Sequence, residues 1–175
     1  MRPVYFFNPS YDERNINFQN LGLVSIASHL KRRGIPAYVY MNYLDERVTK
    51  EKDYDLVLED VIKQNPKYIG ISCMTTQYMK ALDLTKRIKE LSPETMIIWG
   101  GHHVNAYNLV LAKEQAMRTH PLIDRFVTGW GERTCQYFYE GKSDGFPFAQ
   151  PSDFSTVITY QPVECSMRGR MDKQA

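Results

Sequence analysis

The sequence predicts an α/β protein with a five-stranded parallel sheet and helices on both faces. Five short apolar runs, rich in β-branched and aromatic residues, alternate along the chain with segments of helical periodicity. Parallel strands need long crossover connections, and the helical segments supply them. The chain has 175 residues, 43% of them hydrophobic and 24% charged, which is enough to bury the core of one domain.

The first half of the chain begins with an expected strand at residues 4–7 (VYFF), which a polar segment containing proline ends. Apolar residues then recur at helical spacing over 21–30. A second strand is expected at 36–41, followed by a charged connection over 42–52. Apolar residues at helical spacing over 56–62 predict the next helix.

The second half repeats the alternation. Strands are expected at 68–72, 95–99 and 123–128, and helices at 82–91, 105–118 and 131–139. From about Gly141 the periodicity stops and prolines punctuate the chain. We therefore predict one domain over residues 1–140 and an extended C-terminal tail or linker over 141–175. The element order fits the flavodoxin-like (Rossmann-like) strand order 2-1-3-4-5.

Small or polar residues follow each expected strand, at the edge where ligands bind in such sheets. Ser72, Thr75 and Thr76 offer hydroxyl groups, and Gly100 and Gly101 allow a bulky ligand to approach the backbone. The alternative is that the glycines form only a turn and that the hydroxyls only cap a helix. If the first interpretation holds, valine at either glycine should block the ligand while the fold survives.

Several occupants of this fold lack their signature here. No glycine-rich phosphate loop follows the first strand, which argues against dinucleotide and flavin sites. A receiver domain would have an aspartate where Ser72 stands. The net charge of +2 gives no basis for binding nucleic acid or an anionic membrane, and no apolar run is long enough for a bilayer span.

The three cysteines include no C-x-x-C pair, so we expect a reducing, cytoplasmic location and no zinc or four-cysteine iron–sulfur site. His102 and His103, with Glu132 and Cys135, suggest a metal site. However, adjacent histidines in an extended turn point apart, so we expect no metal ligand from the protein.

Four segments carry a family resemblance. Residues 20–34 (NLGLVSIASHLKRRG) resemble the LGL-x-x-(L/I)-A-x-x-L-(K/R)-x-x-G start of the cobalamin (B12)-binding domain that precedes radical SAM domains. Residues 70–75 (GISCMT), 99–104 (WGGHHV) and 127–134 (VTGWGERT) are similar to that family's GIS-x-MT, GG-(P)-H-V and V-x-G-E-G-E-x-T segments. They occur in order at matching spacing and span roughly residues 1–140.

The resemblance implies a domain that holds cobalamin, with the corrin over the strand ends and the nucleotide tail beside the sheet. The cofactor-binding residues that it implies are Asn8, Ser10, Leu21, Gly22, Ser72, Met74, Thr75, Thr76, Gly100, Gly101, His102, His103, Val104, Gly129, Gly131 and Glu132. Residues 8–14 contain no histidine, unlike the D-x-H-x-x-G loop of corrinoid proteins whose histidine ligates cobalt. The resemblance therefore implies base-off binding without a histidine lower ligand.

The family continues into a radical SAM domain with a C-x-x-x-C-x-x-C motif, which this sequence lacks. We therefore expect no catalysis by this chain alone. We expect a protein that binds or carries cobalamin, with a separate radical SAM or methyltransferase chain as its partner. The alternatives are a corrinoid methyl-carrier subunit of a methyltransferase and a B12-responsive regulator or light sensor.

Overall fold

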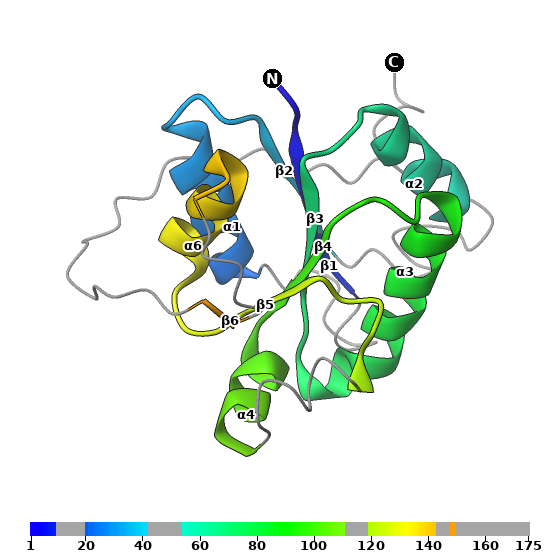
Figure 1. Cartoon of the computed structure of the whole chain (residues 1–175), viewed down its shortest axis with the longest axis vertical. Coiled ribbons are helices and arrows are strands. Elements are labelled where there is room, and N and C mark those ends of the chain that lie inside the picture. Colours follow the sequence, from blue (N-terminus) through cyan, green and yellow to red (C-terminus); the bar gives the residue numbers. More distant parts are fainter. Residues whose placement is uncertain (10–19, 42–53, 111–118, 143–147, 150–175) are drawn as a thin grey trace.

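The fold is a parallel sheet with strand order β2-β1-β3-β4-β5-β6. It is seen in a computed structural model that describes residues 1–9, 20–41, 54–110, 119–142 and 148–149 (Figure 1). The strands are β1 (Val4–Asn8), β2 (Ala37–Met41), β3 (Tyr68–Ser72), β4 (Ile97–Gly100), β5 (Arg125–Val127) and β6 (Phe148–Ala149). The predicted order of the first five strands is confirmed, and every pairing is parallel.

The sixth strand corrects the prediction of five. It comes from the segment after Gly141 that was expected to be an extended tail, and it pairs Phe148 with Phe126 and Ala149 with Val127. A strand of two residues has no periodicity for a sequence pattern to reveal. It forms hydrogen bonds with backbone groups at the outer edge of β5 that would otherwise be unpaired.

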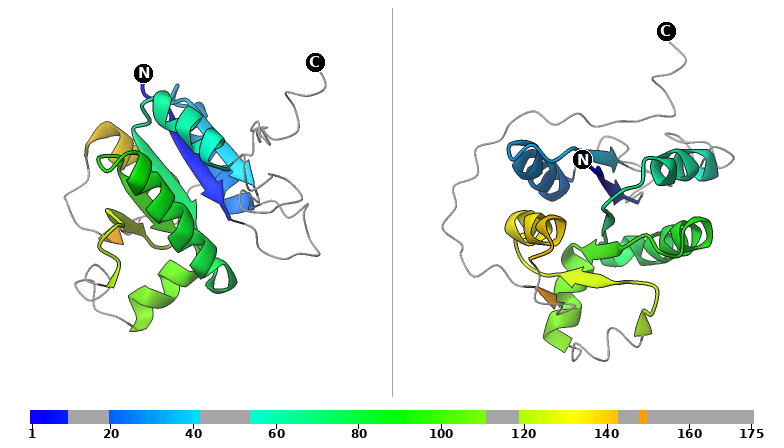
Figure 2. Two further views of the ribbon diagram at one scale, coloured as in Figure 1. Left: turned by 90° about the vertical axis from the view of Figure 1, so that its right-hand side faces the viewer. Right: turned by 45° about the horizontal axis from the view of Figure 1, so that its top comes forward.

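Helices cover both faces of the sheet, as predicted. They are α1 (Leu21–Lys31), α2 (Tyr54–Lys63), α3 (Tyr78–Leu91), α4 (His102–Val110) and α6 (Gly131–Glu140), with a short 3₁₀ helix η2 (Thr75–Gln77) before α3. α1 and α6 lie on one face and α2 and α3 on the other, as the right-hand view of Figure 2 shows. None of these helices is long and apolar enough to span a membrane.

Two helices begin three or four residues before the predicted start, whereas the other boundaries inside the described ranges lie within two residues of the prediction. α4 begins at His102 rather than at 105, directly after the turn at Gly101, and α3 begins at Tyr78 rather than at 82. Residues 111–118 of the helix expected over 105–118, the charged connection over 42–52 and residues 150–175 of the expected tail lie outside the described residues.

Successive side chains along each strand point to opposite faces of the sheet, and the core is therefore divided into two layers. Phe7, Ile71 and Trp99 pack beneath α2 and α3. Phe6 and Ile98 point the other way and pack beneath α1 and α6. The strands β1 to β5 are buried on both faces, which explains the continuous apolar runs in the sequence.

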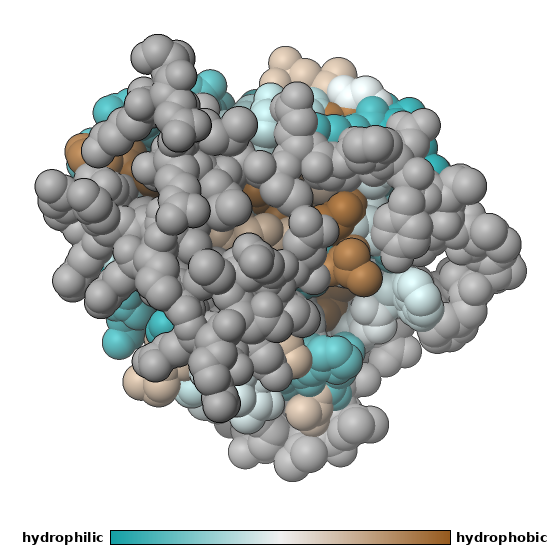
Figure 3. Space-filling view, turned by 180° about the vertical axis from the view of Figure 1, so that it is seen from behind, coloured by the Kyte–Doolittle hydropathy of each residue, from teal (hydrophilic) through white to brown (hydrophobic). Residues whose placement is uncertain are grey.

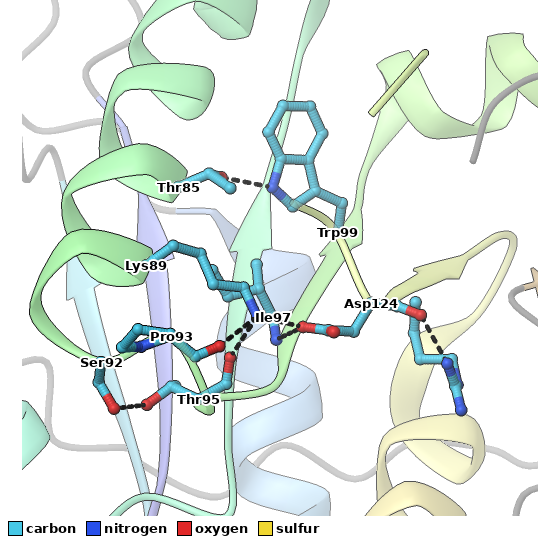
Figure 4. A network of polar contacts seen from close by, with 9 residues as sticks. Thr85, Lys89, Ser92, Pro93, Thr95, Ile97, Trp99 and Asp124 are labelled. Carbon is cyan, nitrogen blue, oxygen red and sulfur yellow. Dashed lines mark hydrogen bonds and ion pairs between the residues drawn. The ribbon is translucent and has the colours of Figure 1, made fainter. Parts of the chain in front are cut away.

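A polar network joins α3 to β4 and β5 at the end of the sheet opposite the carboxyl ends of the strands (Figure 4). Asp124 Oδ2 accepts hydrogen bonds from the Ile97 backbone N–H at 2.7 Å and from Lys89 Nζ at 2.9 Å. Lys89 also donates to the carbonyl oxygens of Pro93 at 3.2 Å and Thr95 at 2.9 Å. The network therefore fixes the start of β4 and the turn before it.

Asp124→Ala should lower the free energy of unfolding by about 1–3 kcal/mol, because the buried Ile97 N–H loses its acceptor and Lys89 loses its carboxylate partner. Asp83→Ala is the matched control, since Asp83 pairs with Arg87 at the surface and its loss should cost under ~0.5 kcal/mol. Urea denaturation measures both, and equal losses would contradict this role of Asp124.

Candidate functional site

A cavity of about 650 Å³ lies between the sheet and the helices α1 and α6. It opens at the carboxyl ends of the strands, near Ser72 and Gly100, which pair with each other in register. It extends back to the row formed by Phe6, Gly70 and Ile98, two residues earlier along the strands. Two residues at a rise of about 3.3 Å each mean that the cavity extends about 7 Å along the strands from its mouth.

The wall of the cavity is mainly apolar. Leu21, Leu23 and Ile26 contribute from α1, and Ile98 and Val127 from the sheet. Seen from behind, the molecule shows hydrophobic side chains gathered in a hollow near the centre of the view (Figure 3). An apolar concave site with a few polar groups is typical of small-molecule binding.

Six of the described glycines line the cavity, and three of them, Gly70, Gly100 and Gly131, differ in what lies beside them. A Cβ at Gly70 would lie 2.5 Å from Cδ1 of Phe6, and a Cβ at Gly131 would lie 2.7 Å from Cδ1 of Ile26, so neighbouring side chains already fill these two places. A Cβ at Gly100 would come no closer than 3.5 Å, to the carbonyl oxygen of Val127. Space next to Gly100 is therefore open toward the cavity.

Gly101 serves the fold instead. Its φ is +98°, and a Cβ there would lie 2.7 Å from the carbonyl oxygen and 2.9 Å from the nitrogen of Cys73. No side chain fits against that backbone. We therefore expect valine at Gly101 to strain the fold itself, so that only valine at Gly100 tests the ligand site.

Asn20 joins the start of α1 to the strand ends at the mouth of the cavity. Its Oδ1 accepts the Leu23 N–H at 3.1 Å and caps the helix, while its Nδ2 donates to Ser72 Oγ at 2.7 Å and to Asn8 Oδ1 at 3.3 Å. Because Ser72 Oγ accepts from Asn20, its own hydrogen is directed elsewhere and can be donated to a group in the cavity.

Asn8 lies behind Asn20 and does not line the cavity. It is fully buried, and its Nδ2 has no hydrogen-bond partner among the described residues. Gln77 packs beside it, with Nε2 3.5 Å from Asn8 Oδ1 and 2.6 Å from the Pro9 carbonyl oxygen. Asn8 therefore supports the strand-end loops from below.

Glu132 is a buried carboxylate in the first turn of α6, where the helix dipole favours negative charge. Ser25 Oγ on α1 donates to its Oε1 at 2.6 Å. Just before this turn, the Gly129 N–H donates to Asn105 Oδ1 at 3.0 Å, which ties the loop after β5 to α4. Trp130 is 57% exposed at the mouth, beside these groups.

Cys135 lines the cavity as a thiol. Burial raises its pKa to about 12, so at neutral pH it is neither a nucleophile nor a thiolate ligand. Cys73 is buried in the opposite layer, and burial raises its pKa to about 12 as well. Within the described ranges, no three His, Cys, Asp or Glu side chains come together in a way that could hold a metal ion.

The cavity brings together most of the residues expected at the site. Those that line it are Leu21, Gly22, Ser72, Met74, Gly100, Gly101, His102, Gly129, Gly131 and Glu132. Thr75 and Thr76 are exposed in η2 and do not line it, and Val104 is fully buried in the layer beneath α3. Ser10 lies outside the described residues.

His103 also lies away from the cavity. Its Nδ1 is 3.2 Å from Thr75 Oγ1, and its ring centroid is 4.8 Å from that of Tyr78. The buried His120 lies near the same tyrosine, with 5.8 Å between ring centroids. Burial lowers the pKa of both histidines, so both favour the neutral form.

The sequence analysis missed several residues of the wall. Asn20 could have been found, because an asparagine directly before a helical run signals a cap. Trp130 stands between two glycines already singled out. Phe6, Ile98 and Cys135 carry no such signal, because apolar runs do not reveal which residues border a cavity.

An apolar cavity at the carboxyl edge of a parallel sheet defines a domain that binds a small organic ligand or cofactor. Comparison with known proteins identifies the cofactor. The B12 binding domain family matches residues 13–138, which is more than half of the chain. The chain belongs to this family, and its cofactor is cobalamin.

Two curated relatives are larger proteins. The chain is 29% identical over 115 residues to an uncharacterised methyltransferase of Pyrococcus horikoshii, an alignment that covers 59% of this chain and 24% of the relative. It is 24% identical over 134 residues to the anaerobic magnesium-protoporphyrin IX monomethyl ester cyclase of Rubrivivax gelatinosus, covering 74% and 22%. The chain thus spans less than a quarter of either relative.

Solved structures share the fold. Two structures of the radical S-adenosylmethionine methyltransferase TsrM from Kitasatospora setae match 82% of this chain at 16% identity. One, with tryptophan and a SAM analogue bound, has a TM-score of 0.61 over 27% of its chain. The other, with cobalamin and a [4Fe-4S] cluster bound, has a TM-score of 0.60 over 25% of its chain.

Gly101→Ala should destabilise the protein by about 1–3 kcal/mol, because the methyl group meets the Cys73 backbone and the positive φ is strained for alanine. Gly100→Ala is the matched control, since its methyl group has space, and it should change the free energy of unfolding by under ~1 kcal/mol. Urea denaturation of both variants tests this, and an unchanged Gly101→Ala would contradict it.

Proposed function

We propose that the chain binds cobalamin base-off, with the nucleotide tail in the cavity between the sheet and α1/α6 and the corrin over the strand ends. The observation that carries this proposal is the apolar cavity that opens beside Gly100. Its volume of about 650 Å³ suits a group the size of a nucleotide. Space at Gly100, where a Cβ would meet no atom within 3.4 Å, supports close approach of such a group to the backbone.

The residues proposed to hold the cofactor are those at the mouth and wall of the cavity. Ser72 offers a hydroxyl donor to a phosphate or amide oxygen, and the exposed ring of Trp130 offers an apolar contact at the mouth. Glu132 offers an acceptor for a hydroxyl or amide hydrogen. Asn8 and Asn20 act as positioning residues, since they hold Ser72 and the start of α1 in place.

When bound, cobalamin supplies a cobalt centre that can carry a methyl group. The chain's own side chains bind and shield the cofactor: Cys135 remains a protonated thiol, and Glu132 is already bonded to Ser25. We therefore propose that the protein presents cobalamin to a separate radical SAM or methyltransferase partner. The methyltransferase among its relatives and the methyltransferase fold neighbours support this choice.

Gly100→Val should reduce cobalamin affinity at least about tenfold, because the side chain occupies space next to the proposed tail site. Protein mixed with hydroxo-, methyl- or adenosylcobalamin and then desalted should otherwise retain about one corrin per chain, measured by absorbance. Ala106→Val is the control, since Ala106 is exposed on α4 and does not line the cavity. Absence of corrin from the unmodified protein with all three forms would refute the proposal.

Bound cob(II)alamin should show an electron paramagnetic resonance spectrum without nitrogen splitting, because the base is detached and no histidine replaces it. His103→Ala should leave the spectrum unchanged, since His103 contacts Thr75 and Tyr78 outside the cavity. His102→Ala is the second variant, because His102 lines the mouth. Nitrogen splitting that disappears in either variant would identify that histidine as a cobalt ligand and contradict the proposal.

A further inference from the structure

We infer that the cavity selects among cobamides by the polarity of their lower base, and that it takes benzimidazolyl or phenolyl cobamides in preference to purinyl ones. This rests on the proposed placement of the nucleotide tail. Cobamides share the corrin and differ in this base. The atoms lining the depth of the cavity therefore decide which members of the class fit.

The depth of the cavity is built from apolar side chains. Phe6 and Ile98 form the row furthest from the mouth, and Leu23 and Cys135 face them from α1 and α6. Val127 lies between Gly100 and Gly131: its Cβ is 3.9 Å from the place of a Cβ at Gly100, and its Cγ1 is 3.7 Å from that place at Gly131. A base with apolar edges is complementary to this surface.

The hydroxyl donors at this depth are already committed. Ser25 Oγ donates to Glu132 at 2.6 Å, and Tyr68 Oη donates to the Cys135 carbonyl oxygen at 2.8 Å. Burial keeps Cys135 protonated, so it offers a weak S–H donor at most. Among the described residues, the side chains lining the depth thus leave no strong donor for the ring nitrogens of a purine.

A purine base would therefore lose hydrogen bonds to water without regaining them. Glu132 can accept one hydrogen bond from the amino group of adenine, but the ring nitrogens of adenine remain buried acceptors. An unpaired buried polar group weakens binding by about tenfold. A benzimidazole or a phenol ring has fewer acceptors to leave unpaired.

The test measures dissociation constants of the unmodified protein for cobalamin, adeninyl cobamide, p-cresolyl cobamide and cobinamide, which has no nucleotide tail. All are kept in the Co(I) state, in which no cobamide has its base on cobalt. Adeninyl cobamide should bind at least about tenfold more weakly than cobalamin, and p-cresolyl cobamide within about threefold of it. Equal affinity for adeninyl cobamide and cobalamin would overturn the inference.

The other outcomes separate the inference from the proposed function. If no corrinoid binds, cobalamin carriage fails. If cobinamide binds as tightly as cobalamin, the tail does not use the cavity, and both the placement and the selectivity fall. If cobalamin binds more tightly than both cobinamide and adeninyl cobamide, the result supports the placement of the nucleotide tail and the selectivity for its base.

A variant that adds a donor provides an independent check. Val127→Thr nearly preserves shape and places a hydroxyl at the cavity wall, so the ratio of the adeninyl to the benzimidazolyl dissociation constant should fall severalfold. Val39→Thr is the matched control, because Val39 lies in the same core layer but outside the cavity, and its ratio should not change. Cys135→Ser is the second variant should Val127→Thr fail to fold. An unchanged ratio in a folded donor variant would count against the inference.

Discussion

The hydrogen bond between Ser25 and Glu132 joins α1 to α6 across 107 residues of sequence, and both residues line the cavity. The two helices cover one face of the sheet, yet they do not fill the space above Phe6, Gly70 and Ile98. A hydrogen bond of this kind, largely hidden from water, fixes the separation of two elements more closely than apolar contact alone. Together with the contact between His29 Nε2 and Gln136 Oε1 at 3.0 Å, it links the two helices above the open space.

The shape of that space is set by glycines and by the side chains that pack against them. At Gly70 the missing side chain is replaced by the Phe6 ring, and at Gly131 by Ile26, so these glycines give close packing. At Gly100 no neighbouring side chain fills the place of the missing one, and this open space forms part of the mouth of the cavity. Neighbouring glycines in the sequence thus have different roles, and Gly101 next to Gly100 is fixed by its backbone rather than by the cavity.

The sequence predicted the order of the first five strands because these strands are buried on both faces and the helices α1, α2 and α3 between them have an apolar period. It could not predict β6, which is too short for a pattern. Of the predicted site residues, Ser72 and Gly100 stand at strand ends and Glu132 was implied by the family resemblance, and all three line the cavity. The prediction also included Thr75 and Val104, since a strand-end loop has residues on both sides of the sheet and spacing alone does not assign them to one side.

The apolar lining of the cavity has a thermodynamic consequence. Water inside it meets few hydrogen-bonding partners, and an occupant returns that water to bulk. Removal of this much apolar surface from water gives binding a negative heat-capacity change, so the binding enthalpy becomes more favourable with rising temperature. An occupant that binds only the folded state also shifts the unfolding equilibrium, so the thermal midpoint depends on how much of the protein carries its ligand.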